Sequence, residues 1–228
     1  TYINKGLLKE CKIDKIVFED CNLSGFKTLD CYIIDLDFND QDKTKFDDKT
    51  CFGKIPEIEK TKEEYEGIYT AYEAIAFKCK ENNLVDNYGE YYYLGKVCER
   101  KSLKKIVPKL GSYIYWITCG YGQRALYPVF FSLGVIVLCA ILYLFVGIKI
   151  GDEIIRLSLS SIINDNFRTN LSYLNESFNL SVGLFTGVGA FNSEPIPSTY
   201  IISNIEMIIG LLMMGVGVAT LIKKAKNN

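Results

Sequence analysis

Two long apolar stretches lie in the second half of the chain, from about Tyr127 to Ile148 and from about Tyr200 to Ile222. Each supplies the roughly 20 residues that a helix needs to cross the hydrocarbon core of a bilayer. Backbone inside lipid must satisfy its own N–H and C=O groups, so isolated spans of this kind are helical. We therefore expect an α-helical membrane protein with two spans, at 127–148 and 199–224.

A short glycine-rich run, Thr186-Gly187-Val188-Gly189-Ala190, lies between these two stretches and follows an amphipathic segment at 177–185. Irregular backbone at membrane depth is tolerated where it is buried in protein or lines water. A ring of such carbonyl groups can replace the hydration shell of an ion. The order of span, loop, amphipathic segment, glycine-rich run and span therefore predicts the subunit of an ion channel.

Basic residues flank the two spans and predict their orientation. They are Lys96, Arg100, Lys101, Lys104, Lys105, Lys109 and Arg124 before the first span, and Lys223, Lys224 and Lys226 after the second. Cytoplasmic flanks carry an excess of Lys and Arg. We expect a multi-pass protein of the plasma membrane with both termini cytoplasmic and residues 149–175 as an extracellular loop.

Aromatic and basic side chains mix at 112–126, just before the first span, which is typical of a helix at the level of the lipid headgroups. This segment also contains Thr118-Cys119-Gly120-Tyr121-Gly122, which is closer by letter to the potassium filter T-V-G-Y-G than residues 186–190 are. A filter needs a span on both sides, and the residues upstream of Gly120 are too charged to cross a bilayer. We interpret Gly120-Tyr121-Gly122 as a turn.

Composition argues against an enzyme. The chain has no histidine, which excludes His-based acid–base catalysis and His metal ligands. No nucleophile–base pair or metal cluster is visible, and no cofactor is expected beyond the permeant ions. The eight cysteines avoid the loop between the spans, which fits free thiols in a reducing compartment. Cys11, Cys21 and Cys31 are candidate metal ligands, but small buried side chains are the preferred interpretation.

The first forty residues repeat with a period of five. The positions in this series are Ile3, Leu8, Ile13, Phe18, Leu23, Thr28, Ile33 and Phe38. Neither a helix nor a flat strand has this period. Cys11-Lys12-Ile13, Cys21-Asn22-Leu23 and Cys31-Tyr32-Ile33 resemble pentapeptide-repeat proteins, which implies a cytosolic square β-solenoid over 1–40 with four repeats per turn.

Two turns of a solenoid are short, so upstream coils beyond Thr1 or a helical cap are expected. Exposed positions mix Lys12 and Lys27 with Glu19 and Asp30, unlike a phosphate backbone. We expect a cytosolic protein partner on the solenoid and no nucleic acid.

Residues 41–55 are polar and read as a linker, and two apolar stripes at helical spacing follow within 56–111. Glutamates after Pro56 favour a helix start, and Asn82-Asn83 separates the two stripes. The many tyrosines fit either a helix–helix core or base stacking for RNA, and their spacing favours the core. The segment resembles the α-helical hairpin linker that joins pentapeptide repeats to a channel in some prokaryotic proteins.

Residues 127–224 resemble the pore of two-transmembrane members of the potassium-channel superfamily, of prokaryotic type. Phe185-Thr186-Gly187-Val188-Gly189-Ala190-Phe191-Asn192 stands where the family has F-T-T-V-G-Y-G-D. The resemblance implies a homotetramer in the lipid bilayer, a pore helix and selectivity filter within 176–192, and conduction of K⁺ or another monovalent ion. The sequence departs from the family at Gly187, Ala190, Phe191 and at the pore-mouth residue Asn192, so potassium selectivity is left open.

The second span contains further candidate residues. Glu206 is an ionisable residue in a span, and it lies either in the permeation path or behind the filter as its support, which the resemblance favours. Gly210 stands where the family has an inner-helix hinge. The small residues Gly215, Gly217 and Ala219 either line the inner pore or permit close helix packing.

The fold expected is thus a two-span, α-helical pore-loop channel with a small pentapeptide-repeat β-solenoid and a helical hairpin. The expected function is passive ion conduction by a tetramer with an atypical filter, with cations favoured. The alternatives are an anion-conducting or non-selective pore on the same scaffold, and a membrane-tethered pentapeptide-repeat scaffold that does not conduct.

Overall fold

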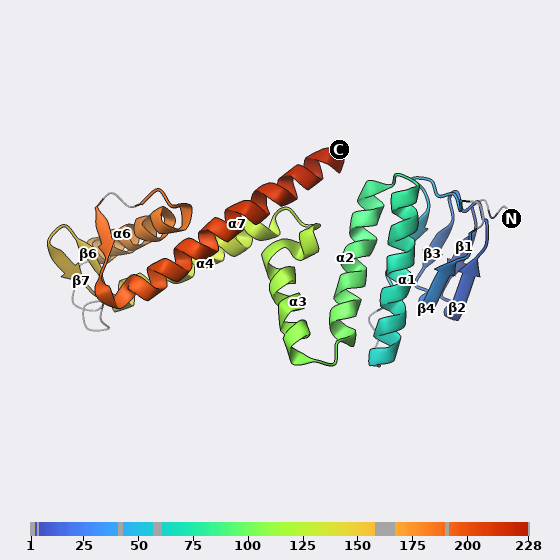
Figure 1. The fold of residues 1–228 in the computed structure, drawn as a ribbon, viewed down its shortest axis with the longest axis horizontal. Coiled ribbons are helices and arrows are strands. Elements are labelled where there is room, and N and C mark those ends of the chain that lie inside the picture. The colour runs from blue at the N-terminus through green and yellow to red at the C-terminus, as the bar shows by residue number, and fades with distance from the viewer. Residues whose placement is uncertain are drawn as a thin grey trace. The chain divides into compact units, whose positions relative to one another are not determined.

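The structure is a computed structural model that describes residues 3, 5–40, 43–56, 61–157, 167–189 and 192–227. It is mostly helical (Figure 1), and its contacts divide it into two compact units, Thr1–Trp116 and Ile117–Lys226. Each unit is described by itself.

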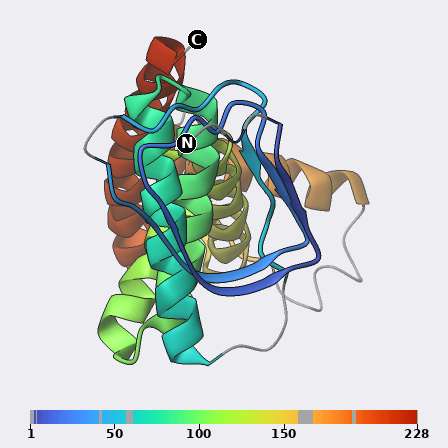
Figure 2. The same ribbon diagram turned by 90° about the vertical axis from the view of Figure 1, so that its right-hand side faces the viewer.

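The first unit begins with short parallel strands. They are β1 (Leu7–Lys9), β2 (Lys12–Phe18), β3 (Lys27–Leu29), β4 (Tyr32–Phe38) and β5 (Cys51–Phe52). Strand β1 pairs with β3, β3 with β5, and β2 with β4. The register pairs Leu7 with Lys27 and Lys12 with Tyr32, so the chain comes to lie beside its own earlier turn after 20 residues. Figure 2 shows these successive turns running side by side.

Left-handed backbone recurs at multiples of five residues in this region. Lys5, Glu10, Asp20, Gly25 and Asp30 have φ values of 59°, 54°, 44°, 69° and 52°. Asp and Gly adopt this conformation more readily than other residues do. The five-residue period of the sequence is thus matched by a five-residue period of backbone turns.

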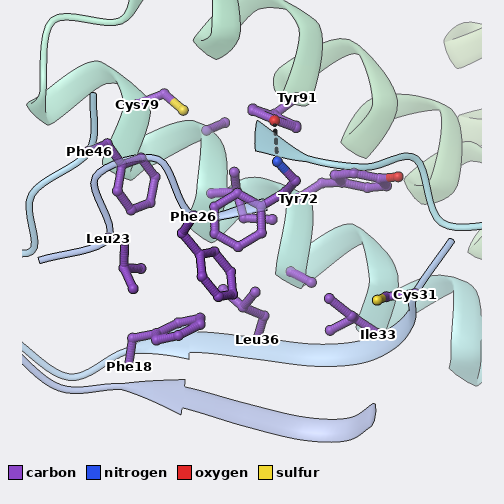
Figure 3. Packing of buried hydrophobic residues seen from close by; sticks show 14 of the residues in the cluster. Phe18, Leu23, Phe26, Cys31, Ile33, Leu36, Phe46, Tyr72, Cys79 and Tyr91 are labelled. Atoms are coloured by element: carbon purple, nitrogen blue, oxygen red, sulfur yellow. Dashed lines mark hydrogen bonds between the residues drawn. The ribbon is translucent and has the colours of Figure 1, made fainter. Parts of the chain in front are cut away.

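The interior of these turns is a ladder of apolar side chains (Figure 3). Leu23 and Leu36 are fully buried, and the rings of Phe18 and Phe38, one turn apart, stack with centroids 5.7 Å apart. Cys21 and Cys31 are buried, and their thiols donate to the carbonyls of Glu19 and Leu29. No group of three or more potential metal ligands occurs among the described residues.

Two antiparallel helices, α1 (Lys62–Glu81) and α2 (Val85–Ser102), follow the strands. A capping box of Thr61 and Glu64 begins α1, and the hydrogen bond from the Thr61 N–H helps to hold the pKa of Glu64 below its usual value. The glutamates after Pro56 had predicted that the helix starts there. Residues 57–60 of that prediction lie outside the described part of the chain, and the helix itself begins at Lys62. The break at Asn82-Asn83 is confirmed.

Helix α1 packs directly on β4, the last long strand. A Cβ atom on Gly67 would lie 2.6 Å from the carbonyl oxygen of Ile34, so the absence of a side chain allows this close approach. Tyr72 of α1 and Tyr91 of α2 are buried and their rings stack, and the Tyr91 hydroxyl accepts a 2.8 Å hydrogen bond from the Phe52 N–H (Figure 3). These tyrosines form a helix–helix and helix–strand core, as their spacing predicted.

Helix α3 (Ile106–Cys119) leads into the 3₁₀ turn η1 (Gly120–Gly122). The expected headgroup-level helix was placed at 112–126, so the observed helix starts earlier and stops before the glycines. Gly120, Tyr121 and Gly122 all have positive φ, 53°, 56° and 71°. The prediction of a turn at Gly120-Tyr121-Gly122 is confirmed.

The second unit contains α4 (Tyr127–Val146), β6 (Ile148–Ile150), β7 (Glu153–Ile155), α6 (Phe167–Thr186), β8 (Ser193–Pro195), the turn η2 (Pro197–Thr199) and α7 (Tyr200–Asn227). Two helices are long and apolar enough to cross a membrane: Tyr127–Val146 with mean hydropathy 2.8, and Pro197–Lys223 with mean hydropathy 2.2. They match the two predicted spans in position and length.

The segment between the spans is more regular than its sequence predicts. The interval 149–175, expected as a loop, includes most of the β6–β7 hairpin and the first turns of α6. Strand β6 also pairs antiparallel with β8, which joins Ile148 to Pro195. The small sheet β7–β6–β8 therefore ties the residues after α4 to the residues just before α7.

Candidate functional site

The C-terminal end of α6 and the glycines after it form the candidate site. Thr186 is the last helical residue, and its hydroxyl donates to the Val182 carbonyl at 2.7 Å. The Gly187 N–H donates to the Leu184 carbonyl, and the Gly189 N–H donates to the Gly183 carbonyl at 3.0 Å. The segment after the helix therefore turns back along the last turn of α6 instead of continuing away from it.

Both described glycines of this segment need their conformational freedom. Gly187 has φ 73° and Gly189 has φ 84°, in the left-handed region that residues with a Cβ adopt only with strain. A Cβ atom at either position would meet no atom within 4 Å. The constraint on these two residues is thus conformational rather than steric.

A pocket of about 360 Å³ lies along this segment. One face of α6 supplies Glu176, Asn179, Val182, Gly183 and Thr186, and the following segment supplies Val188, Gly189 and Asn192. The described lining includes a carboxylate, two amides and a hydroxyl, and no basic side chain. Carboxylate, carbonyl and hydroxyl oxygens are groups that replace the water around a hard cation.

The predicted filter residues divide between the described and the undescribed parts of the chain. Thr186, Val188, Gly189 and Asn192 line the pocket, with Gly187 between them. Ala190 and Phe191 lie outside the described residues, so the interpretation of these two positions stays a prediction. Glu176, which lines the same pocket, was not singled out from the sequence as a site residue.

Glu206 lies apart from this pocket, in a buried polar cluster that joins three helices. Its side chain on α7 is fully buried, and one carboxylate oxygen accepts a 2.7 Å hydrogen bond from the Tyr143 hydroxyl of α4. The other oxygen accepts from the Ser181 hydroxyl of α6, and the Cys139 thiol of α4 is a further hydrogen-bonding neighbour. Glu206 therefore links α7 to the helix that carries the glycine segment, through side chains rather than through backbone groups of α6.

Small polar residues accompany this cluster. Ser177 and Ser181 on α6 and Thr199 in η2 are fully buried, and Thr199 caps the turn by accepting from the Ile196 N–H at 2.9 Å. Small hydroxyl-bearing residues allow close packing of helices and hydrogen bonds between them in membranes. Tyr143, Cys139 and Ser181 are uncharged at neutral pH, so the sequence, unlike at Glu206, gives no signal that marks them as site residues.

Gly210 marks a contact between two backbones. A Cβ atom added there would overlap the carbonyl oxygen of Phe185 and would lie 2.8 Å from its carbonyl carbon. Helix α7 runs through Gly210 without interruption. The glycine thus allows α7 to touch the residue that immediately precedes Thr186, and its predicted role as a hinge stays a prediction.

The remaining predicted residues lie further along α7. Cβ atoms at Gly215 and Gly217 would meet nothing within 4 Å, and Ala219 is exposed. Within one described chain these residues contact no other helix closely, so the two interpretations of them, inner pore and helix packing, both stay open.

No protein-family model, curated protein or solved structure matches this chain.

Proposed function

We propose that the protein is the pore-forming subunit of a membrane ion channel. In this proposal α4 and α7 span the bilayer, and the segment after α6 lines an ion path. One observation carries the proposal: between two candidate spans, α6 ends in glycines with left-handed backbone beside an oxygen-lined pocket of about 360 Å³. Such irregular backbone between spans is hard to explain in a protein that is only anchored to the membrane.

The charges around the pocket favour cations over anions. The last carbonyls of a helix carry about half an elementary negative charge, and Thr186 at that end of α6 lines the pocket. Glu176 adds a carboxylate at the other end of the lining, near Ser193, whose hydroxyl lies 3.4 Å from the Glu176 carbonyl. An anion-conducting pore is the less favoured alternative for this reason.

The resemblance to the two-transmembrane potassium-channel superfamily supports the same proposal. Thr186, Val188 and Gly189 keep the family's letters, whereas Gly187 has no hydroxyl to offer an ion and Asn192 has no charge. We propose that the pore conducts monovalent cations with weak preference for K⁺. One such segment does not enclose a path, and the resemblance implies four subunits around it.

The strand region supports a second part of the proposal. A register of 20 residues and left-handed corners at multiples of five are what a square pentapeptide-repeat solenoid requires. We propose that the strands form coils of such a solenoid, that α1 covers the end at β4, and that the solenoid docks a cytosolic protein. The basic flanks of the spans support cytoplasmic termini in the plasma membrane.

The test is the reversal potential of the purified full chain in planar bilayers under a KCl gradient. The proposal predicts a reversal close to the potassium equilibrium potential, and close to zero when Na⁺ replaces K⁺ on one side at equal concentration. A reversal at the chloride potential would overturn cation conduction. A protein that assembles but never conducts would support the tethered scaffold instead.

A paired substitution tests the filter assignment. Gly189→Val forces a β-branched residue into left-handed backbone, whereas Gly134→Ala in α4 introduces a methyl group with no atom within 4 Å. We expect Gly189→Val to abolish the current without loss of assembly, and Gly134→Ala to conduct like the wild type. Full conductance in Gly189→Val would rule out residues 186–192 as the ion path.

A further inference from the structure

Helix α3 exposes an apolar stripe. Ile106 is 83% exposed, and the stripe continues at helical spacing through Leu110, Ile114 and Ile117, each more than half exposed, with Val107 (81%) beside it. Positions i, i+4, i+8 and i+11 fall on one face of a helix. A row of aliphatic side chains this exposed is unusual on a surface that faces water alone.

Two aromatic residues of α3 fix it to α2. The Trp116 indole N–H donates to the Tyr93 hydroxyl at 2.9 Å, and the Arg100 guanidinium lies over the rings of Tyr113 and Trp116 at 4.3 and 4.6 Å. Cation–π contacts of this geometry add to the packing of the aromatic rings. The helix is therefore held on α2 through Tyr113 and Trp116, while the aliphatic residues of the stripe stay more than half exposed.

Basic residues gather at the start of this helix. Lys101 lies in the last turn of α2, Lys104 and Lys105 lie in the connection, and Lys109 lies in the first turn of α3. The sequence has no Asp or Glu from Arg100 to Gly151. Lys104 lies 3.6 Å from Glu63, but both side chains are more than two-thirds exposed, and such pairs contribute little.

The chain places this helix close to the membrane if α4 spans it. Only the seven residues 120–126 separate α3 from α4. An extended chain covers at most about 3.6 Å per residue, so the end of α3 stays within a few tens of ångströms of the start of the span. A helix with an aliphatic stripe and flanking lysines has the composition of one that lies in a bilayer interface.

We propose that α3 binds the surface of a bilayer that contains anionic lipids, with the stripe Ile106, Leu110, Ile114 and Ile117 among the acyl chains and Lys104, Lys105 and Lys109 on the lipid phosphates. The occupant of the stripe is thus lipid and not a protein. The lysines attract the negative surface of the leaflet, and the exposed aliphatic side chains leave water. This inference depends on the spanning role of α4 but not on conduction, so it stands or falls independently of the channel test.

Trp116 is the only tryptophan of the chain and lies on α3, so its fluorescence reports on this helix alone. The full chain is reconstituted in vesicles of mixed phosphatidylcholine and phosphatidylglycerol, with bromine atoms near the headgroup on one lipid or on the other. Bromine quenches tryptophan only at short range. We expect quenching by brominated phosphatidylglycerol to exceed quenching by brominated phosphatidylcholine at the same mole fraction by about two-fold.

Two variants separate charge from apolar contact. Lys104→Gln/Lys105→Gln/Lys109→Gln is expected to remove the excess quenching by the anionic lipid, and Lys27→Gln/Lys45→Gln/Lys49→Gln, which changes three exposed lysines of the strand region, is the matched control. Leu110→Gln/Ile114→Gln is expected to reduce quenching by both lipids. Circular dichroism shows whether each variant keeps its helices.

Three results would overturn the proposal. They are equal quenching by the two lipids in the wild type, an excess that survives the triple substitution at 104, 105 and 109, and an absence of quenching by either lipid. A conducting channel with any of these results would leave the proposed function intact and would overturn only the binding of α3 to an anionic lipid surface.

Discussion

The contact between α7 and the end of α6 depends on Gly210, and Gly210→Ala tests it. The added Cβ would overlap the Phe185 carbonyl oxygen and would lie 2.8 Å from the carbonyl carbon and 3.0 Å from the Cα atom. All three are backbone atoms, so no change of side-chain rotamer relieves the overlap. Either α7 or the last turn of α6, which positions Thr186 and Gly187, must move.

The expected magnitude follows from two opposing contributions. An extra methyl group in a packed contact typically costs about 1–3 kcal/mol, and replacing Gly by Ala within a helix returns about 0.5–1 kcal/mol. Gly210→Ala should therefore change the free energy of unfolding by between about zero and 2.5 kcal/mol in the destabilising direction. Gly215→Ala, in the same helix, gains the same helical propensity and meets no atom within 4 Å.

The assay compares the thermal unfolding of the two variants, purified as full chains in detergent, with their conductance in bilayers. The difference in unfolding free energy between Gly210→Ala and Gly215→Ala measures the cost of the overlap alone, about 1–3 kcal/mol. For a chain of this size, that cost corresponds to a difference of about 2–12 °C in Tm. We expect Gly210→Ala to be the less stable variant and to conduct less, because the proposed filter segment after α6 is displaced. Equal Tm values and equal currents would refute the contact, whereas an altered open probability with unchanged Tm would favour the hinge.

Three further substitutions test the contacts that join helices and strands. Tyr91→Phe leaves the buried Phe52 N–H without its partner and should lower stability by about 1–3 kcal/mol in denaturant unfolding, while Tyr88→Phe should have no measurable effect. Tyr143→Phe removes the hydroxyl that donates to Glu206 and should lower the free energy of unfolding by a similar amount, about 1–3 kcal/mol. Tyr200→Phe, at an exposed position, is its control. Equal Tm values for these two variants would contradict the hydrogen bond. Burial opposes ionisation of Asp40, but hydrogen bonds from Lys78 and Thr44 outweigh burial and lower the pKa of Asp40 in the folded chain. The ionised carboxylate therefore contributes its full stabilisation above the pKa of the unfolded chain. This stabilisation is lost as the pH falls through the pKa of the folded chain. Asp40→Asn should therefore lower Tm at pH 7 and flatten the loss of Tm as the pH falls below about 4, and an unchanged pH profile would contradict the ion pair.

The parts of the fold that could be predicted are those with a local periodic or compositional signal. The spans were found because about 20 apolar residues in a row leave few alternatives, and the helices end within a few residues of the predicted limits. Phe18, Leu23 and Ile33 of the five-residue series are buried, because that series reflects the return of the chain after 20 residues. Thr61 and Glu64 have the spacing of a capping box, which would have placed the start of α1 correctly from the sequence.

The parts that could not be predicted depend on partners far away in the chain. Strands β6 and β8 are three residues each, and their pairing joins Ile148 to Pro195, so neither has a local pattern that identifies it. The hydrogen bond between Tyr143 and Glu206 spans 63 residues, and the sequence shows only two polar residues within apolar helices. The early start of α6 was missed because its first turns are rich in polar residues that resemble a loop.

Two glycine-rich segments show that the position of a segment relative to the spans identifies the candidate site better than its match to the filter motif does. Residues 118–122 match the family's filter letters better, yet Tyr121 is buried with φ 56° in a tight turn directly after α3, and no helix long enough to span a membrane precedes it among the described residues. Residues 186–189 match less well, but they follow the C-terminal end of α6, lie between two candidate spans, and leave Val188 79% exposed beside the pocket. An ion path needs accessible backbone oxygens between two spans, and a turn with its tyrosine buried does not provide them. The geometry therefore favours 186–192 as the segment to mutate first, despite its weaker resemblance.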